Sequence, residues 1–246
     1  MSFIAQFRII EEKDKAAVVR KLLESSTPDF DFFYLVGLSV IMATLGLLAD
    51  SPSIVIGSML IAPLLYPILG VALGLVMSNF EVLGRSMLTL TKSLIIALVL
   101  SVITTLLFGD GFVTQEMSTR IDPSLIHFMV AVVAGAAVSF ALAQPQWSET
   151  LPGIAISVAL IPPLAVVGSG IALLDMAVIK GSLVMLIVNL LGIIFSAMVS
   201  FSLMNLYEKQ DIAVSTIKRE EKKQQKEKEA IEAVIDKNGK KEHDIV

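Results

Sequence analysis

Long apolar runs separated by short polar turns fill the chain between residues 32 and 205, and charged residues collect at its two ends. A helix rises about 1.5 Å per residue, so roughly 20 apolar residues are enough to cross the hydrocarbon core of a bilayer. The six runs are roughly 32–49, 53–77, 93–108, 124–143, 151–175 and 179–204, and a polar linker is predicted over 78–92. This pattern predicts an all-α membrane protein with six transmembrane helices.

Two of the runs are interrupted by prolines and are similar to each other. Residues 51–75 and 151–175 align without gaps, at an offset of 100 residues, and match at two prolines and a glycine: Pro52 with Pro152, Pro63 with Pro163 and Gly70 with Gly170. A proline inside a helix leaves a carbonyl without its partner and bends the axis, so such a segment is expected to face protein or a wet cavity rather than lipid. We therefore expect an internal repeat.

Each copy of the repeat, 32–108 and 124–205, would contribute three spans. Because three is an odd number, the second copy would cross the bilayer in the opposite direction to the first. The sequence thus predicts a 3+3 inverted repeat in which helices 2 and 5 are kinked by proline, and this pattern is typical of many transporters.

The two ends of the chain are polar. Residues 1–31 mix apolar and charged positions at helical spacing and predict an amphipathic cytoplasmic segment, although a solvated leader fits equally well. Residues 206–246 hold ten basic and ten acidic residues and predict a solvated helix that ends near Asn238 and Gly239. Five basic residues precede residue 31, two lie in the 78–92 linker and ten in the tail, whereas the other side receives Arg120 and Lys180. This imbalance predicts a multi-pass protein with both termini in the cytoplasm.

Composition excludes several functions. Hydrophobic residues make up 55% of the 246 and the mean hydropathy is +0.79, which is typical of a membrane protein and not of a soluble domain. The chain has no cysteine, so disulfides and thiolate metal sites are excluded. It also lacks the common hydrolase and phosphate-loop motifs, and acids match the basic residues of the tail one for one. We expect no enzymatic activity, no cofactor or metal, and no nucleic-acid partner.

Several of these segments are similar to those of a known family. The matching segments are 37–75, 131–143 and 153–173, together with Arg120, Pro123 and Asn189. On these residues the chain resembles the domain of unknown function 389 (DUF389) family of hydrophobic multi-span membrane proteins. The resemblance implies an inner-membrane protein of a bacterium or archaeon that assembles as a homo-oligomer. It implies no substrate, because the biochemistry of the family is not established.

Neutral polar groups are the candidates for a binding site, because no acidic or basic residue lies at mid-depth in a predicted span. The two proline motifs would expose backbone carbonyls near the bilayer centre, where a cation or a small neutral solute can bind them. The candidate substrate-binding residues are Ser58, Met59, Pro63, Tyr66, Pro67, Ser157, Pro162, Pro163 and Asn189. We expect them to bind or pass an unknown small solute or ion at the junction of the two kinked helices.

The alternative is a non-transporting protein that serves as an oligomeric membrane scaffold or binds lipid. In that case the prolines only shape helix packing, and each buried serine or threonine bonds to a carbonyl of its own helix. Both interpretations place the chain in contact with the lipid bilayer.

Overall fold

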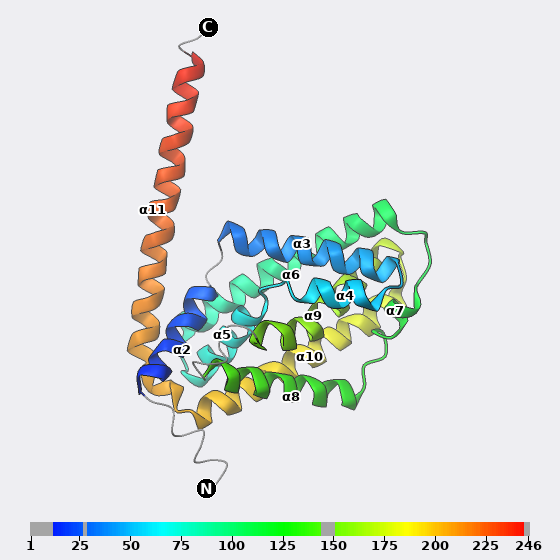
Figure 1. The fold of residues 1–246 in the computed structure, drawn as a ribbon, viewed down its shortest axis with the longest axis horizontal. Coiled ribbons are helices and arrows are strands. Elements are labelled where there is room, and N and C mark those ends of the chain that lie inside the picture. Colours follow the sequence, from blue (N-terminus) through cyan, green and yellow to red (C-terminus); the bar gives the residue numbers. More distant parts are fainter. Residues whose placement is uncertain (1–11, 27–28, 144–150, 244–246) are drawn as a thin grey trace.

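A computed structural model describes residues 12–26, 29–143 and 151–243, and every regular element in this part of the chain is a helix (Figure 1). Over residues 12, 151–159, 227–228 and 230–243 it describes only the backbone of the helices. In chain order the elements are α2 (Glu12–Ser25), α3 (Phe30–Leu48), α4 (Pro52–Met59), α5 (Leu65–Val76), α6 (Phe80–Phe108), α7 (Gln115–Ser118), α8 (Leu125–Leu142), α9 (Leu151–Ala172), α10 (Met176–Leu203), the 3-10 helix η1 (Leu206–Lys209) and α11 (Gln210–His243). The predicted all-α class is confirmed.

Among the residues that the structure describes in full, four helices are long and apolar enough to cross a membrane, namely α3, α6, α8 and α10. Their outward faces carry exposed apolar side chains such as Leu106, Val133 and Phe195, as expected for a protein whose surroundings are lipid. Helix α6 has 29 residues and begins directly after Asn79, whose side chain caps it by accepting hydrogen bonds from two backbone N–H groups of the first turn. The predicted polar linker over 78–92 is therefore wrong, since most of it belongs to α6.

The second predicted span consists of two helices rather than one kinked helix. Helix α4 ends at Met59, α5 begins at Leu65, and residues 60–64 between them are not helical. The break accommodates both prolines. Pro63 falls outside a helix, and Pro67 is the third residue of α5, where a backbone N–H has no partner within the helix in any case. Neither half can cross a bilayer alone, because α4 is about 12 Å long and α5 about 18 Å.

Ser39 fixes the depth of this break. It is the middle residue of the 19-residue helix α3, and its hydroxyl donates a hydrogen bond of 2.6 Å to the carbonyl oxygen of Ser58 in the last turn of α4. Helix α4 therefore runs from the end of α3 back to its middle. Helix α5 lies beyond the break, toward the end of the bundle where α2 packs (Figure 1).

Helix α9 behaves differently, because it continues through Pro162 and Pro163 as one helix of 22 residues. The two proline motifs, which the sequence predicts to be alike, thus have different backbone conformations. The first is broken and the second is continuous.

Three tight turns between helices depend on a glycine. A Cβ atom on Gly46, Gly74 or Gly170 would lie 2.9, 2.7 or 3.1 Å from a backbone nitrogen of the next helix, so the absence of a side chain lets the two helices meet backbone to backbone. In each turn the residue before the N-cap has a positive φ, and these residues are Asp50 (51°), Ser78 (50°) and Leu174 (56°).

The turns after α5 and α9 share the same hydrogen bonds. The Asn79 N–H donates to the Gly74 carbonyl at 3.0 Å, and the Asp175 N–H donates to the Gly170 carbonyl at 3.0 Å. Each of these cap side chains then accepts from two N–H groups of the following helix. Equivalent residues of the two turns are 96 apart, whereas the starts of the proline motifs align at 100. Between its first proline and the glycine of its turn, the first segment is therefore four residues longer than the second. The non-helical residues 60–64 lie in this part of the first segment.

Helices α2 and α11 pack together at one end of the bundle (Figure 1). The apolar face of α2, formed by Val18, Val19, Leu22 and Leu23, is buried, as an amphipathic segment requires; residues 1–11 lie outside the described part of the chain. Helix α11 is tied to the bundle by Gln210, whose side-chain amide donates to the Met77 carbonyl at 2.6 Å. It crosses this end of the bundle and continues past Asn238 and Gly239, where the sequence predicts its end.

Candidate functional site

The break between α4 and α5 is buried on one side, whereas Leu60 at its start is 57% exposed. Met59 and Ala62 have exposed fractions of 3% and 5%. Because Pro63 has no N–H, the Met59 carbonyl lacks the partner that an unbroken helix would supply. The neighbouring Ser58 carbonyl accepts the hydroxyl of Ser39 from the adjacent span. Backbone polar groups at this depth need hydrogen-bond partners inside the protein, and the hydroxyl of Ser39 from the neighbouring helix is such a partner.

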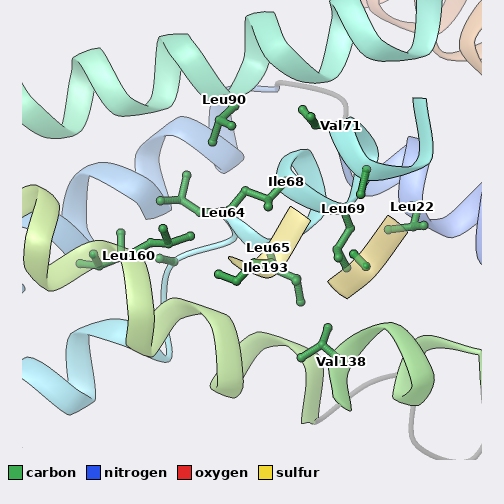
Figure 2. Close-up of a cluster of buried hydrophobic side chains, with 14 of the residues drawn as sticks. Leu22, Leu64, Leu65, Ile68, Leu69, Val71, Leu90, Val138, Leu160 and Ile193 are labelled. Atoms are coloured by element: carbon green, nitrogen blue, oxygen red, sulfur yellow. The ribbon is translucent and has the colours of Figure 1, made fainter. Parts of the chain in front are cut away.

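Aliphatic side chains fill the space beside the break. Figure 2 shows Leu64, Leu65 and Ile68 in the region between α5 and α9, with Leu160 and Ile193 of the facing helices close to them. All five side chains are at most 2% exposed. The junction of the two proline motifs is therefore a packed apolar core in this conformation.

Hydroxyl groups join α3, α6 and α9 on the other side of the break. The Thr44 hydroxyl is shared between a carbonyl of its own helix at 2.8 Å and Ser101 Oγ at 3.1 Å. Ser101 in turn donates to the Ala165 carbonyl at 2.7 Å. One turn further along α6 and α9, the hydroxyls of Thr105 and Ser169 are 2.9 Å apart. These groups form a buried polar row against one face of α9.

Other buried hydroxyls bond to their own helices. Ser58 donates to the Val55 carbonyl at 2.6 Å, Ser93 to Thr89 at 2.8 Å, Ser139 to Gly135 at 2.7 Å and Ser182 to Val178 at 2.6 Å. This is the arrangement expected if serine and threonine serve helix packing. The cross-helix row is therefore a distinct feature, and not a property of every buried hydroxyl.

The candidate residues from the sequence are distributed over α4, α5, α9 and α10. Six are buried, namely Ser58, Met59, Pro67, Pro162, Pro163 and Asn189, and two are half-buried, namely Pro63 and Tyr66. The side chain of Ser157 lies outside the described residues. The helices that carry these residues are in contact, α4 with α9 and α5 with both α9 and α10.

Charged side chains are absent from the buried part of the described spans, where the buried polar residues are Ser, Thr and Asn. The described residues also hold no group of three His, Cys, Asp or Glu that could bind a metal ion. His127 lies at the start of α8, where its Nδ1 is 2.8 Å from Ser124 Oγ in a helix cap. A site in this interior would therefore consist of hydroxyls, an amide and backbone groups.

Sequence reasoning did not single out Ser39, Thr44 or Ser169 as members of this interior. A signal was present, because the hydroxyls of α6 recur on one helical face at Ser86, Thr89, Ser93, Ser101 and Thr105. Such periodicity predicts burial. It does not identify the neighbouring helix that each hydroxyl contacts.

The fold and its apolar surface define an all-helical protein with membrane-spanning helices. The family model described as Domain of unknown function (DUF389) matches residues 59–195, which is more than half of the chain. The chain belongs to this family, as its motifs predict. An uncharacterized protein of Methanocaldococcus jannaschii is 31% identical over 165 residues, covering 67% of this chain and 51% of the relative. This chain thus spans about half the length of that curated relative, and no solved structure matches it.

Proposed function

We propose that this protein binds or passes a small solute or ion at the break between α4 and α5, without enzymatic chemistry. The observation that carries the proposal is the break itself, because helices interrupted at mid-depth form the solute and ion sites of many transporters. The ends of two half-helices bring backbone carbonyl and N–H groups together at such a point. In the absence of a charged side chain in the described interior, a neutral solute or a monovalent cation fits these groups.

The proposed architecture has six crossings arranged as a 3+3 inverted repeat. Helices α4 and α5 together make the second crossing and α9 makes the fifth, while α3, α6, α8 and α10 make the others. The shared hydrogen bonds of the turns at Asn79 and Asp175 support the repeat. In the register of these turns Pro67, and not Pro63, corresponds to Pro163, and the four extra residues of the first copy lie between Pro52 and Gly74.

We propose that the protein lies in the inner membrane with both termini in the cytoplasm. Helix α2, Arg85 and the basic tail lie at one end of the bundle, where Arg85 pairs with Glu221 at 2.9 Å (Figure 1). The opposite end holds α7 and Arg120, which pairs with Glu116 at 2.7 Å. The excess of basic residues at the first end supports its cytoplasmic location.

The second candidate is a non-transporting oligomeric scaffold or lipid-binding protein, and the apolar packing beside the break favours it. Helix α8 also presents an outward strip of side chains that are each more than half exposed, namely Leu125, Ile126, Met129, Val130 and Val133. In a homo-oligomer this strip would contact a second copy, and in a monomer it would face lipid.

A thermal-unfolding screen of the full-length protein in neutral detergent tests the first proposal. The probes are sodium, potassium and ammonium ions against choline at constant ionic strength, and glycerol against sucrose at equal osmolality. A ligand that binds only the folded state raises the unfolding free energy by about 2.7 kcal/mol at 100 times its Kd. We expect one small probe to stabilise the protein.

Variants then locate the binding site. The stabilisation should be lost in Pro63→Ala and Asn189→Ala and kept in Ser93→Ala, whose buried hydroxyl bonds to its own helix. Stabilisation by lipid alone, unchanged in all three variants, would favour the scaffold.

A further inference from the structure

A concave surface lies at the end of the bundle where α2 and α11 pack, away from the break. It is an open groove with a volume of about 940 Å³. Five basic residues of α11 line one side, namely Lys218, Arg219, Lys222, Lys223 and Lys226, and Glu24 and Asp29 contribute to the other side. The groove is therefore a charged site with no counterpart in the apolar interior.

The basic residues form one stripe on α11. The other four follow Lys218 by one, four, five and eight residues, and at 3.6 residues per turn this spacing places all five along a single face of the helix. Within the described part of the chain none of the five takes part in an ion pair. Three acids also line the groove, namely Glu24, Asp29 and Glu220, so its net charge is positive. The tail as a whole has equal numbers of acidic and basic residues. The clustering of basic residues on one side of the groove is therefore visible only in the structure.

The groove lies at the level expected for lipid headgroups. Asp29 in its wall is the N-cap of α3, and the next turn of that helix exposes Phe30 (80%) and Tyr34 (56%), whose rings stack with centroids 6.0 Å apart. Exposed aromatic side chains at the end of a span lie at the membrane–water interface. Helix α11 crosses this end of the bundle, so its basic stripe is held at the same level (Figure 1).

We propose that this groove binds the phosphate-bearing headgroup of an anionic phospholipid. Lysine ammonium groups and an arginine guanidinium are the usual protein partners of phosphate, and basic clusters at the cytoplasmic membrane surface attract anionic lipids. The bound headgroup would hold α11 against the membrane, in addition to the ion pair that Glu221 of this helix forms with Arg85. This role is independent of solute binding at the break.

Native mass spectrometry of the full-length protein in neutral detergent tests the proposal. The protein is titrated with phosphatidylglycerol or with phosphatidylcholine, and the apparent Kd of each lipid is measured. We expect phosphatidylglycerol to bind at least tenfold more tightly. The quadruple variant K218Q/R219Q/K222Q/K223Q should lose at least tenfold in affinity for it. The control variant K228Q/K237Q/K240Q/K241Q, with the same change in charge on the same helix, should change less than twofold.

Two further measurements distinguish a lipid site from other sources of binding. Glu220→Gln, which removes an acid from the groove, should tighten phosphatidylglycerol binding even if the quadruple variant fails to fold. Inorganic phosphate at the same concentration as the headgroup should not displace the lipid. Equal binding of the two lipids, or equal losses in both quadruple variants, would overturn the proposal. Displacement by phosphate would assign the groove to a soluble anion instead of a lipid.

Discussion

The segments α4–α5 and α9 have related apolar sequences and different backbones. Pro63 and Pro67 are four residues apart, and the chain breaks between residues 60 and 64. Pro162 and Pro163 are adjacent, and the helix continues through them. The two segments are similarly rich in aliphatic residues, so hydrophobicity does not explain the difference. Two features therefore decide whether an apolar segment forms one continuous helix. They are the spacing of its prolines and the number of residues available around them.

Proline position gives the physical reason. A proline in the interior of a helix costs about 3 kcal/mol, whereas one in the first turn costs little, because N–H groups there have no helical partner. The break places Pro63 outside a helix and Pro67 in the first turn of α5. Helix α9 lacks the four extra residues that would allow such a break, so its two prolines stay inside the helix and share one local disturbance.

The largest expected effect is at the turns that end the two segments. Gly74→Ala places a Cβ 2.7 Å from the Leu83 backbone nitrogen, so the helices must move apart, and we expect a loss of about 1–3 kcal/mol in unfolding free energy. Gly170→Ala should cost less, because its nearest contact, at 2.9 Å, is a side-chain methyl of Val178. Unfolding by SDS titration in mixed micelles measures both variants.

The control for these variants is Gly84→Ala. No atom lies within 4 Å of its built Cβ, and alanine in a helix is favoured by up to about 1 kcal/mol over glycine. Equal effects of alanine at Gly74 and Gly84 would show that the close approach of the two helices is not required for stability.

The next effect separates the prolines themselves. Pro163→Ala supplies an N–H inside α9 for the Ala159 carbonyl but removes buried ring carbons, at about 0.8 kcal/mol for each methylene. We expect a net stabilisation of about 1–2 kcal/mol on the same SDS titration. Pro67→Ala should give no gain, because the first turn of α5 does not use that N–H. A larger gain at Pro67 than at Pro163 would contradict the explanation by proline position.

The smallest effect concerns the hydroxyl row beside α9. Ser101→Ala removes the donor to the Ala165 carbonyl and should lower the unfolding free energy by about 0.6–1.5 kcal/mol. Ser93→Ala is the matched control, since it is also a fully buried serine of α6 but bonds to the Thr89 carbonyl of its own helix. Equal losses in the two variants would mean that the cross-helix bond contributes nothing specific.

Much of the fold follows from the sequence, because apolar run length and turn residues locate helices directly. The runs predict α3, α6, α8 and α10, and the prolines predict a disturbance in the second span. The sequence does not predict that this disturbance is a full break, because the outcome depends on hydrogen bonds from another span, such as that of Ser39 to the Ser58 carbonyl. The linker over 78–92 is wrong for a related reason, since its polar residues belong to the first turns of α6, where Ser86 and Thr89 are buried against other helices.

The candidate site is predicted less well than the fold. The proline motifs place buried residues at the junction of α4, α5 and α9, but side chains such as Leu64 and Ile193 occupy the space between these helices. Whether facing apolar residues enclose a cavity depends on the distance between helices, which no sequence pattern gives. The sequence does not predict the basic groove, because the charges of α11 are balanced in number and separated only in space.

Thiol accessibility at the break tests the central claim, solute access at mid-depth, most directly. The chain has no cysteine, so a single Ala62→Cys variant carries one reactive group, and Ala97→Cys in the middle of α6 is the buried control. Both are exposed to a membrane-impermeant, water-soluble thiol reagent in reconstituted vesicles, with Gly111→Cys in the loop after α6 as the accessible reference. We predict modification at Ala62 that is slower than at Gly111 and clearly faster than at Ala97. A rate at Ala62 no greater than that at Ala97 would contradict access to the break.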